Sequence, residues 1–492
     1  MRNDPYLKTL TLCWLLAAPQ ALCASGFLAS AGKADITPSL ERTVYVAGYG
    51  SKGRPATGVH DPLWARGIAL QKDKATVVLV NLDLIGFPRP YVERIREGFD
   101  GVYILVASAH THSGPDTLGL WGPKMGHSGV DPAYIDLVID RTRSLIKGLL
   151  KDLRPAKLTA AQTDVDPKGL TRDLRDPVVI DDTLTAIKIV ASATGAPIAT
   201  LVNWSCHPEV LGPDNTLITS DFPHYLRARI ESSSKGTAVF FAGSIGGLLS
   251  PDASADTFSE AERIGTSLAE HALKALMDKS VSLDQTTLTV STAAVRLPVE
   301  NILYLAVLKT AAHGRPIFDA HGRRIGLPYW SHWPGLLKPL AAWLHMRILR
   351  GKAPWLESEM ALVRFGDRLS ILAVPGELFP ELYLGGYDGS KSFQYDVTSK
   401  HNPRPPDLKR APTGGYLKDR MDTRLKLVFG LANDEIGYIV PEYDFRINKL
   451  SPFLYPRPKG HHYEETNSVG SQAAKLIVET AGFLIDNGHN TR

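Results

Sequence analysis

Residues 75–82 have the sequence Ala-Thr-Val-Val-Leu-Val-Asn-Leu, an apolar and β-branched run typical of a buried strand. A helical pattern over 89–99 and a second apolar run at 102–107 follow it, so the three segments predict a βαβ unit. Further elements are expected as a helix over 133–153 and as strands at 183–190, 197–204, 237–242, 287–295, 359–365 and 369–374. This alternation predicts an α/β fold, with mixed α+β as the alternative, in which helices cover a mixed β-sheet core.

The composition is that of a globular protein. The chain has 492 residues and is 44% hydrophobic, which is enough for a large core in one domain or two. Its 55 basic and 51 acidic residues nearly balance and form no long block of either sign, so no nucleic-acid partner is expected. Cys13 and Cys23 fall in or beside a signal-like segment, which leaves Cys206 in the mature chain and predicts no intrachain disulfide.

The N-terminus has the pattern of an export signal. A basic start precedes an apolar stretch at 10–18 and a small-residue end at 21–25, whereas a membrane span would need roughly 20 apolar residues. We therefore expect a signal peptide over 1–24, a catalytic domain over 25–492, and a secreted or periplasmic protein. A lipid anchor on Cys23 is the alternative and would make the protein membrane-associated.

Two stretches depart from the pattern of strands and helices. Residues 327–355 are rich in Trp and Leu with scattered Lys and Arg, which suits a helix lying in a lipid interface. A helix packed on the body of the protein is the alternative for this stretch. Residues 390–424 are polar and rich in Pro, Lys and Arg, and they predict a long surface excursion.

Candidate metal ligands follow several predicted strands. His110 and His112 come directly after the second strand of the βαβ unit, and His207 follows the strand predicted at 197–204. Glu377 follows the last predicted strand, where a buried carboxylate without a cation would be unfavourable. Because the carboxyl ends of strands in an open α/β sheet converge on one crevice, these groups together predict a metal site at that edge.

The chain resembles the neutral, non-lysosomal ceramidases along nearly its whole mature length. The resemblance extends from residues 31–38 and Gly48-Tyr49-Gly50, through the His-Thr-His-Ser-Gly-Pro segment, to Tyr463-Glu464. By this resemblance the four zinc ligands of the family correspond to His110, His207, Glu377 and Tyr438. Three further pocket residues of the family correspond to His112, Arg172 and Tyr463, with Thr171 where the family has Asn.

One block departs from the family pattern. Ser250 matches the serine often assigned as the family's nucleophile, but Leu248 replaces the acidic residue of the Gly-Asp-Val-Ser-Pro-Asn block. Two routes therefore stay open, covalent attack by Ser250 and attack by water that zinc activates, and the loss of the acid favours the second. The family's carboxyl-terminal immunoglobulin-like domain is expected to be absent.

A rival nucleophile lies nearby. Residues 242–246 nearly match the Gly-x-Ser-x-Gly nucleophile elbow, with Ala242 in place of the first glycine and Ser244 at the nucleophile position. No triad partner for Ser244 is indicated by the local sequence.

The resemblance implies a zinc-dependent amidohydrolase that cleaves the N-acyl bond of ceramide. His112 would take or relay a proton, while Arg172 and Tyr463 would orient the amide and donate to the oxyanion. The alternatives are a zinc hydrolase of another N-acyl or ester lipid, and a non-catalytic lipid-binding protein on the same scaffold. The expected partner is a sphingolipid or another N-acyl lipid, with peripheral membrane contact through residues 327–355.

Overall fold

The structure is a computed structural model that describes residues 26–301, 315–326, 353–385, 398–446 and 462–488, together with the single positions 304, 337, 340 and 344. The signal peptide predicted over 1–24 lies outside the described residues, as does most of the segment 327–355. Within the described ranges, no helix is long and apolar enough to cross a membrane.

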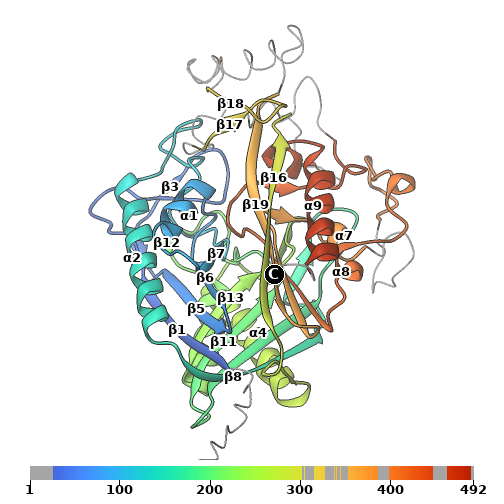
Figure 1. Ribbon diagram of the computed structural model, residues 1–492. Helices are drawn as coiled ribbons and strands as arrows, with labels where there is room; N and C mark the ends of the chain where they lie inside the picture. Colours follow the sequence, from blue (N-terminus) through green and yellow to red (C-terminus); the bar gives the residue numbers. More distant parts are fainter. Residues whose placement is uncertain are drawn as a thin grey trace, which may run out of the picture.

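Two β-sheets form the centre of the molecule (Figure 1). The order of the nine-stranded sheet is β13 (Thr237–Ala242), β11 (Pro197–Trp204), β10 (Thr183–Ala191), β8 (Arg154–Asp164), β1 (Phe27–Asp35), β5 (Trp64–Lys72), β6 (Ala75–Leu82) and β7 (Tyr103–Ser108), with β15 (Val281–Ser282) paired to β8. The order of the six-stranded sheet is β18 (Arg324–Ile325), β17 (Ile317–Phe318), β19 (Trp355–Phe365), β20 (Leu369–Ala373) and β22 (Leu425–Phe429), with β16 (Leu288–Pro298) paired to β19. Parallel pairing joins β6 to β7, β11 to β13 and β20 to β22.

The two sheets pack face to face through apolar side chains. Along β6, Val77 and Leu79 belong to the core between the sheets, while Val78 belongs to the core on the opposite face. Phe241 of β13 stacks on Phe429 of β22 with ring centroids 4.1 Å apart. A strand that is buried on both faces needs a nearly continuous apolar run, which is why these strands were predictable from sequence.

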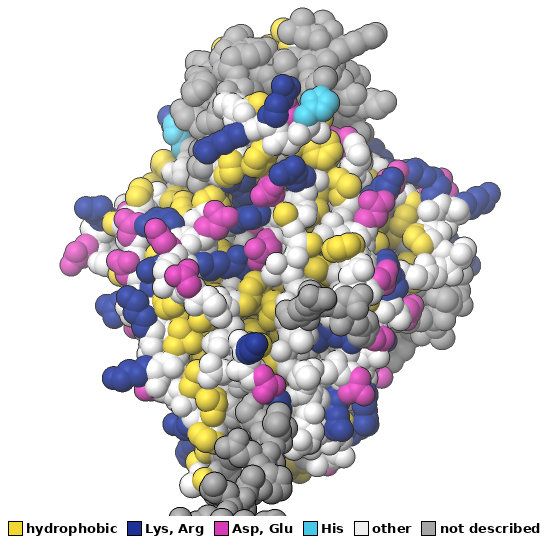
Figure 2. Space-filling view, in the orientation of Figure 1, with side chains coloured by type: hydrophobic (Ala, Val, Ile, Leu, Met, Phe, Trp, Pro, Cys, Tyr) yellow, Lys and Arg dark blue, Asp and Glu magenta, His cyan; other side chains and the backbone are white. Residues whose placement is uncertain are grey.

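Helices cover the outer faces of both sheets and complete a four-layer arrangement (Figure 1). The first sheet is covered by α1 (Arg89–Arg96), α2 (Pro132–Lys151), α3 (Phe222–Ser234) and α4 (Phe258–Asp278). The second sheet is covered by α7 (Pro380–Tyr383), α8 (Leu417–Arg420) and α9 (Ala473–Asn487). Helix α2 begins where the Asp131 carboxylate accepts a hydrogen bond from the backbone N–H of Ala133. On the face shown in Figure 2, side chains of both charges are interspersed.

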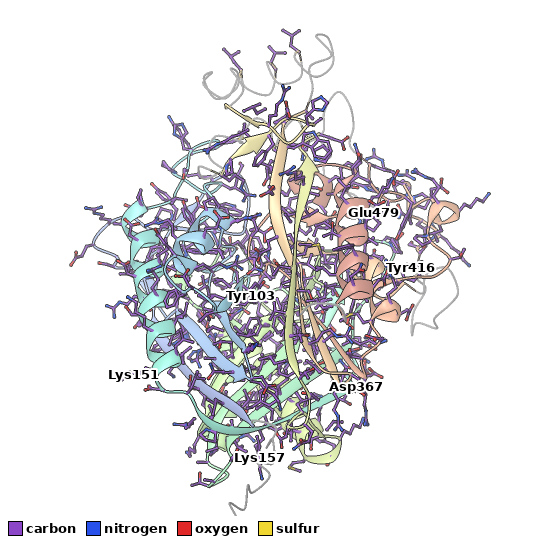
Figure 3. All side chains as sticks on the ribbon, in the orientation of Figure 1. Tyr103, Lys151, Lys157, Asp367, Tyr416 and Glu479 are labelled. Atoms are coloured by element: carbon purple, nitrogen blue, oxygen red, sulfur yellow. The ribbon has the colours of Figure 1, made fainter. Side chains whose placement is uncertain are left out.

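The predicted α/β class is confirmed, and the predicted βαβ unit is β6-α1-β7. The prediction of a surface excursion over 390–424 is wrong at its C-terminal end, because Tyr416, Leu417 and Met421 are buried in the core beneath α9. Figure 3 marks Tyr416 on that side of the molecule. Trp355, the last residue of the predicted lipid-interface segment, is instead the half-buried first residue of β19.

Residues 430–433, directly after β22, join the two ends of the first sheet. This sheet curls until β13 contacts β6 and β7. The backbone N–H of Gly430 donates to the carbonyl of Ala242 at the end of β13, at 3.1 Å. The backbone N–H of Ser108 at the end of β7 donates to the carbonyl of Leu431, at 3.2 Å. The carboxyl ends of β7 and β13 are thereby held close together.

Two residue types make this short bridge feasible. A Cβ atom on Gly430 would lie 2.6 Å from the carbonyl oxygen of Gly243, so the close approach requires glycine. Asn433 has a φ of 65°, a left-handed conformation that asparagine tolerates better than most residues, and its side-chain oxygen accepts a hydrogen bond from the N–H of Val106 at 3.2 Å.

Candidate metal centre and active site

Two histidines and a glutamate meet at the carboxyl ends of three strands. His110 follows β7, His207 follows β11, and Glu377 follows β20. The Nε2 atom of His207 lies 3.0 Å from Oε2 of Glu377, and the Nε2 atom of His110 lies 3.6 Å from the same oxygen. All three side chains are buried. The structure therefore brings these predicted ligands together at the predicted edge.

Backbone carbonyls orient both imidazole rings. Nδ1 of His110 donates to the carbonyl of Ile85 at 2.5 Å, and Nδ1 of His207 donates to the carbonyl of Leu249 at 2.9 Å. Because a carbonyl can only accept, Nδ1 of each ring carries a proton, and Nε2 of each ring faces Glu377. This second hydrogen bond is typical of histidines that ligate a metal. His110 also has a φ of 72°, and such strain is common at functional sites.

Burial controls the charge of these rings. Burial lowers the pKa of His110 to about 3, and burial followed by the charges of His207 and Arg54 lowers the pKa of His112 well below its usual range. Burial also opposes charge on His207, but its hydrogen bond to Glu377 and the nearby carboxylates outweigh that effect and raise its pKa. His110 and His112 are therefore neutral near pH 7, the form that binds a metal.

His112 completes a group of three buried histidines. The candidate ligand atoms of His110, His112 and His207 lie within 4.8 Å of one another. In the described part of the chain, neither ring nitrogen of His112 has a hydrogen-bond partner. Nδ1 nevertheless lies 3.2 Å from a carboxylate oxygen of Glu209. A buried polar atom without a partner is unfavourable, so Nε2 indicates a group that binds here. A cluster of imidazole nitrogens and a carboxylate fits a transition-metal ion such as zinc.

Two tyrosines lie beside this cluster. Strand β21 (Glu377–Leu378) pairs in parallel with β23 (Tyr438–Ile439), which places Tyr438 next to Glu377. Burial and then the charge of Glu377 raise the pKa of Tyr438 well above its usual value. The ring of Tyr463 lies 6.1 Å from that of Tyr438, centroid to centroid. All four predicted ligands and Tyr463 therefore occupy one region.

Ser250 is joined to the site through Glu209, whereas the Arg172 side chain is exposed to solvent. Strand β14 (Leu249–Pro251) pairs with β9 (Thr171–Asp173), and Ser250 lies opposite Arg172 in that pairing. Among the described residues, the Arg172 side chain has no hydrogen bond or ion pair. Ser250 is buried, and its hydroxyl donates to a carboxylate oxygen of Glu209.

Glu209 was not identified from the sequence. Its Oε2 atom lies 3.2 Å from Nδ1 of His112 and accepts a hydrogen bond from the hydroxyl of Tyr49 at 3.0 Å. The only available signal was an acidic residue two positions after His207. Leu248, which stands where the family has an acid, has a φ of 62° and packs against the apolar cluster of Phe379, Tyr438 and Val440. The carboxylate beside Ser250 therefore comes from a different segment.

The rival nucleophile Ser244 is poorly placed. Ser244 is fully buried, and within the described ranges its hydroxyl has no hydrogen-bond partner that could serve as a base. Ser250 is thus the serine that the structure joins to the histidine cluster. A hydroxyl beside basic and cation-binding side chains in one buried site is typical of a hydrolase.

Comparisons with known proteins agree that the site is that of a hydrolase. Residues 27–247 match the sequence model of the family described as neutral/alkaline non-lysosomal ceramidase, N-terminal. The predicted resemblance to that family is therefore confirmed over these residues, and with it the predicted class of enzyme, a hydrolase of amide bonds. No curated protein matches the chain by sequence.

Solved structures share the fold. The crystal structure of neutral ceramidase from Pseudomonas aeruginosa is similar with a TM-score of 0.64 and 17% sequence identity, over 94% of this chain and 75% of that chain. A structure described as ceramidase complexed with C2 has a TM-score of 0.62 and 17% identity, over 94% of this chain and 76% of that one. At this identity the two structures establish the fold alone, and the family model supports a relationship to that family over residues 27–247.

Proposed function

We propose that this protein is a zinc-dependent amidohydrolase that cleaves the N-acyl bond of ceramide to give sphingosine and a fatty acid. The observation that carries the proposal is the buried cluster in which the Nε2 atoms of His110 and His207 face Glu377. The family match supports the substrate class. The structure titled as a ceramidase complexed with C2 shares the fold and supports it as well.

In this proposal His110, His207, Glu377 and Tyr438 would hold the zinc ion. Their nitrogen and oxygen donors are those that zinc prefers, and the two imidazole rings already present Nε2. Zinc held there would supply Lewis acidity, which would polarise the scissile carbonyl and lower the pKa of water so that it can lose a proton and attack near neutral pH.

The remaining side chains would bind the amide and move protons. His112 has a ring nitrogen without a hydrogen-bond partner, so it can accept a proton from the attacking group. Tyr463, half-buried beside Tyr438, can donate to the oxyanion, and Arg172 can orient the polar end of the lipid from its exposed position. Ser250 either attacks the carbonyl or positions the substrate.

A lipid panel tests this function directly. We expect the purified protein to contain one zinc per chain and to release fatty acid from ceramide. A chelator should abolish release, and added zinc should restore it, because the zinc ion held by the cluster would supply the Lewis acidity. Metal analysis and product chromatography would measure both effects.

The outcomes separate the alternatives. Turnover of other N-acyl or ester lipids without turnover of ceramide would assign the same chemistry to another substrate. Lipid binding without turnover of any lipid would favour a binding protein. Ceramide hydrolysis that survives complete removal of metal would contradict the zinc-dependent mechanism.

We also propose that the segment 327–355 contacts the lipid surface. Leu337, Leu340 and Leu344, the positions described within 327–352, are 46%, 58% and 40% exposed. Spacings of three and four residues place side chains on one face of a helix, so these leucines can enter a lipid interface together.

Substituting two of these leucines tests the contact. We expect Leu337→Ser with Leu340→Ser to lower activity on bilayer ceramide by about tenfold per leucine, since burying a leucine contributes roughly 1.5–3 kcal/mol. Activity on a water-dispersed, short-chain N-acylsphingosine should be unchanged. Met277→Ser, at an 81% exposed position on α4, is the matched control. Equal losses on both substrates would contradict the proposed membrane contact.

We also propose that the protein is exported from the cytoplasm. The basic start, apolar stretch and small-residue end over residues 1–24 support a secreted or periplasmic location. An extracellular location would bring the enzyme to the outer surface of a membrane that contains its substrate.

A further inference from the structure

Glu209 lies between two side chains of the proposed active site. The hydroxyl of Ser250 donates to Oε1 of Glu209, and Nδ1 of His112 lies 3.2 Å from Oε2. The side chain of Glu209 is only 11% exposed, so water competes little for these contacts. One carboxylate thus contacts both a hydroxyl and an imidazole at the centre of the site.

The backbone fixes the position of this carboxylate. The N–H of His112 donates to the carbonyl of Pro208 at 3.1 Å, and the N–H of His207 donates to the carbonyl of Leu249 at 2.8 Å. These two hydrogen bonds tie the segment of Glu209 to the segments of His112 and Ser250. The three side chains are therefore placed by one set of backbone contacts.

Tyr49 contacts the carboxylate oxygen of Glu209 that Ser250 does not bond. Its hydroxyl donates to Oε2 of Glu209 at 3.0 Å, and its ring packs edge-on against His112 at 4.9 Å between centroids. Burial and the charge of Glu209 raise the pKa of Tyr49, so the tyrosine keeps its proton and remains a donor. Gly48 permits the close packing, since a Cβ there would lie 2.5 Å from Cγ of His112.

We propose that Glu209 is a positioning residue that holds the Ser250 hydroxyl and the His112 ring in one productive arrangement. This inference rests on the proposed amide hydrolysis and extends it with a residue that the family comparison does not indicate. A free serine hydroxyl rotates among several orientations, whereas the carboxylate selects one of them. The role is the same whether Ser250 attacks the carbonyl or positions the substrate.

Two variants of Glu209 test the role. We expect Glu209→Ala to lower kcat on a water-dispersed, short-chain N-acylsphingosine by roughly 10²-fold, with KM and zinc content unchanged, because misplaced reacting groups lower kcat by about that factor. Glu209→Gln keeps an oxygen that can accept from Ser250, so it should recover part of the loss. Glu479→Ala, an exposed position on α9 marked in Figure 3, is the control.

A double-mutant cycle with Ser250→Ala separates positioning from general support of the fold. If Glu209 acts through Ser250, Glu209→Ala should have little further effect on kcat in the Ser250→Ala protein. The urea-unfolding midpoints of the same four proteins report the interaction between the two residues even if Ser250→Ala abolishes turnover. A loss in the double variant that is smaller than the sum of the two single losses supports the proposal.

Three results would overturn the proposal. The first is that the effects of Glu209→Ala and Ser250→Ala add up in both kcat and the urea-unfolding midpoint. The second is an unchanged kcat in both Glu209 variants, and the third is loss of zinc from Glu209→Gln. Absence of amide hydrolysis in the wild-type protein would count instead against the proposed function. In that case the double-mutant cycle measured by urea unfolding would alone decide whether Glu209 interacts with Ser250.

Discussion

Replacing His207 by alanine should remove the zinc and lower ceramide hydrolysis by at least about 10³-fold. His207 is fully buried, and its Nε2 lies 3.0 Å from Glu377 at the centre of the cluster. Lewis-acid catalysis contributes several kcal/mol, and each 1.36 kcal/mol corresponds to a factor of ten in rate. Metal analysis and turnover on one preparation would measure both losses, and the far-UV spectrum should be unchanged.

Two companion variants sharpen this test. His271→Ala, at an exposed position on α4, should keep both zinc and activity. His112→Ala should keep zinc and lose roughly 10²–10⁴-fold in rate if His112 carries a proton. Loss of zinc from His112→Ala would make it a ligand, as the group of three histidines allows. Retention of stoichiometric zinc in His207→Ala would contradict the assignment of His207.

Arg175→Met should destabilise the fold by about 3–5 kcal/mol near neutral pH, the usual effect of removing one partner of a buried ion pair. Arg175 is buried and donates to the carboxylates of Asp444, Glu464 and Glu465, at 2.8 Å, 2.5 Å and 3.0 Å for the closest contact of each. Without the arginine, these buried carboxylates lose their counter-charge. Urea unfolding would measure the change.

The loss should depend on pH in a defined direction. Burial alone would raise the pKa of Glu465, but the charge of Arg175 and hydrogen bonds from Arg175 and His462 hold it at about 2. A depressed carboxyl pKa stabilises the fold above the unfolded value near 4.5, and that stabilisation is lost as the pH falls toward 2. Burial raises the pKa of Asp444, a second partner of Arg175, to about 6. The difference between wild type and Arg175→Met should therefore be largest above about pH 6, where both carboxylates are ionised, and shrink on acidification.

A nearby arginine gives the control. Arg172→Met, three residues away and exposed, should change stability by no more than about 0.5 kcal/mol. A destabilisation by Arg175→Met that stays constant from pH 7 to pH 3 would show that packing, such as the contact of its guanidinium with the Phe379 ring, dominates over charge.

The sequence predicts those features that follow from local patterns. Strands β6, β7 and β11 were predicted because both of their faces are buried, which makes their sequences continuously apolar. The sequence also predicts that His110 and His207 lie close together, because the carboxyl ends of their strands converge at one edge of the sheet. A local pattern carries no information about which strands share a sheet, so the division into two stacked sheets was not predicted.

The features that the sequence does not predict are those that long-range contacts place. The family pattern points to Arg172, which is exposed, whereas Arg175, three positions later, is buried and pairs with Glu464 and Glu465. Glu209 likewise gains its role from the hydrogen bond between Pro208 and His112, residues that are distant in the chain. In the same way, the polar composition of 390–424 concealed the few apolar residues that pack beneath α9.

The bridge formed by residues 430–433 has a consequence for synthesis of the chain. Strands β7 and β13 are the two edges of the first sheet, and a ribosome completes both long before it reaches residue 430. Until that segment emerges, the nascent sheet has two unprotected edges, which are templates for aggregation. The same segment leads into Tyr438, so the last proposed ligand emerges only after the edges can close. Assembly of the active site is thus a late event that coincides with protection of the sheet.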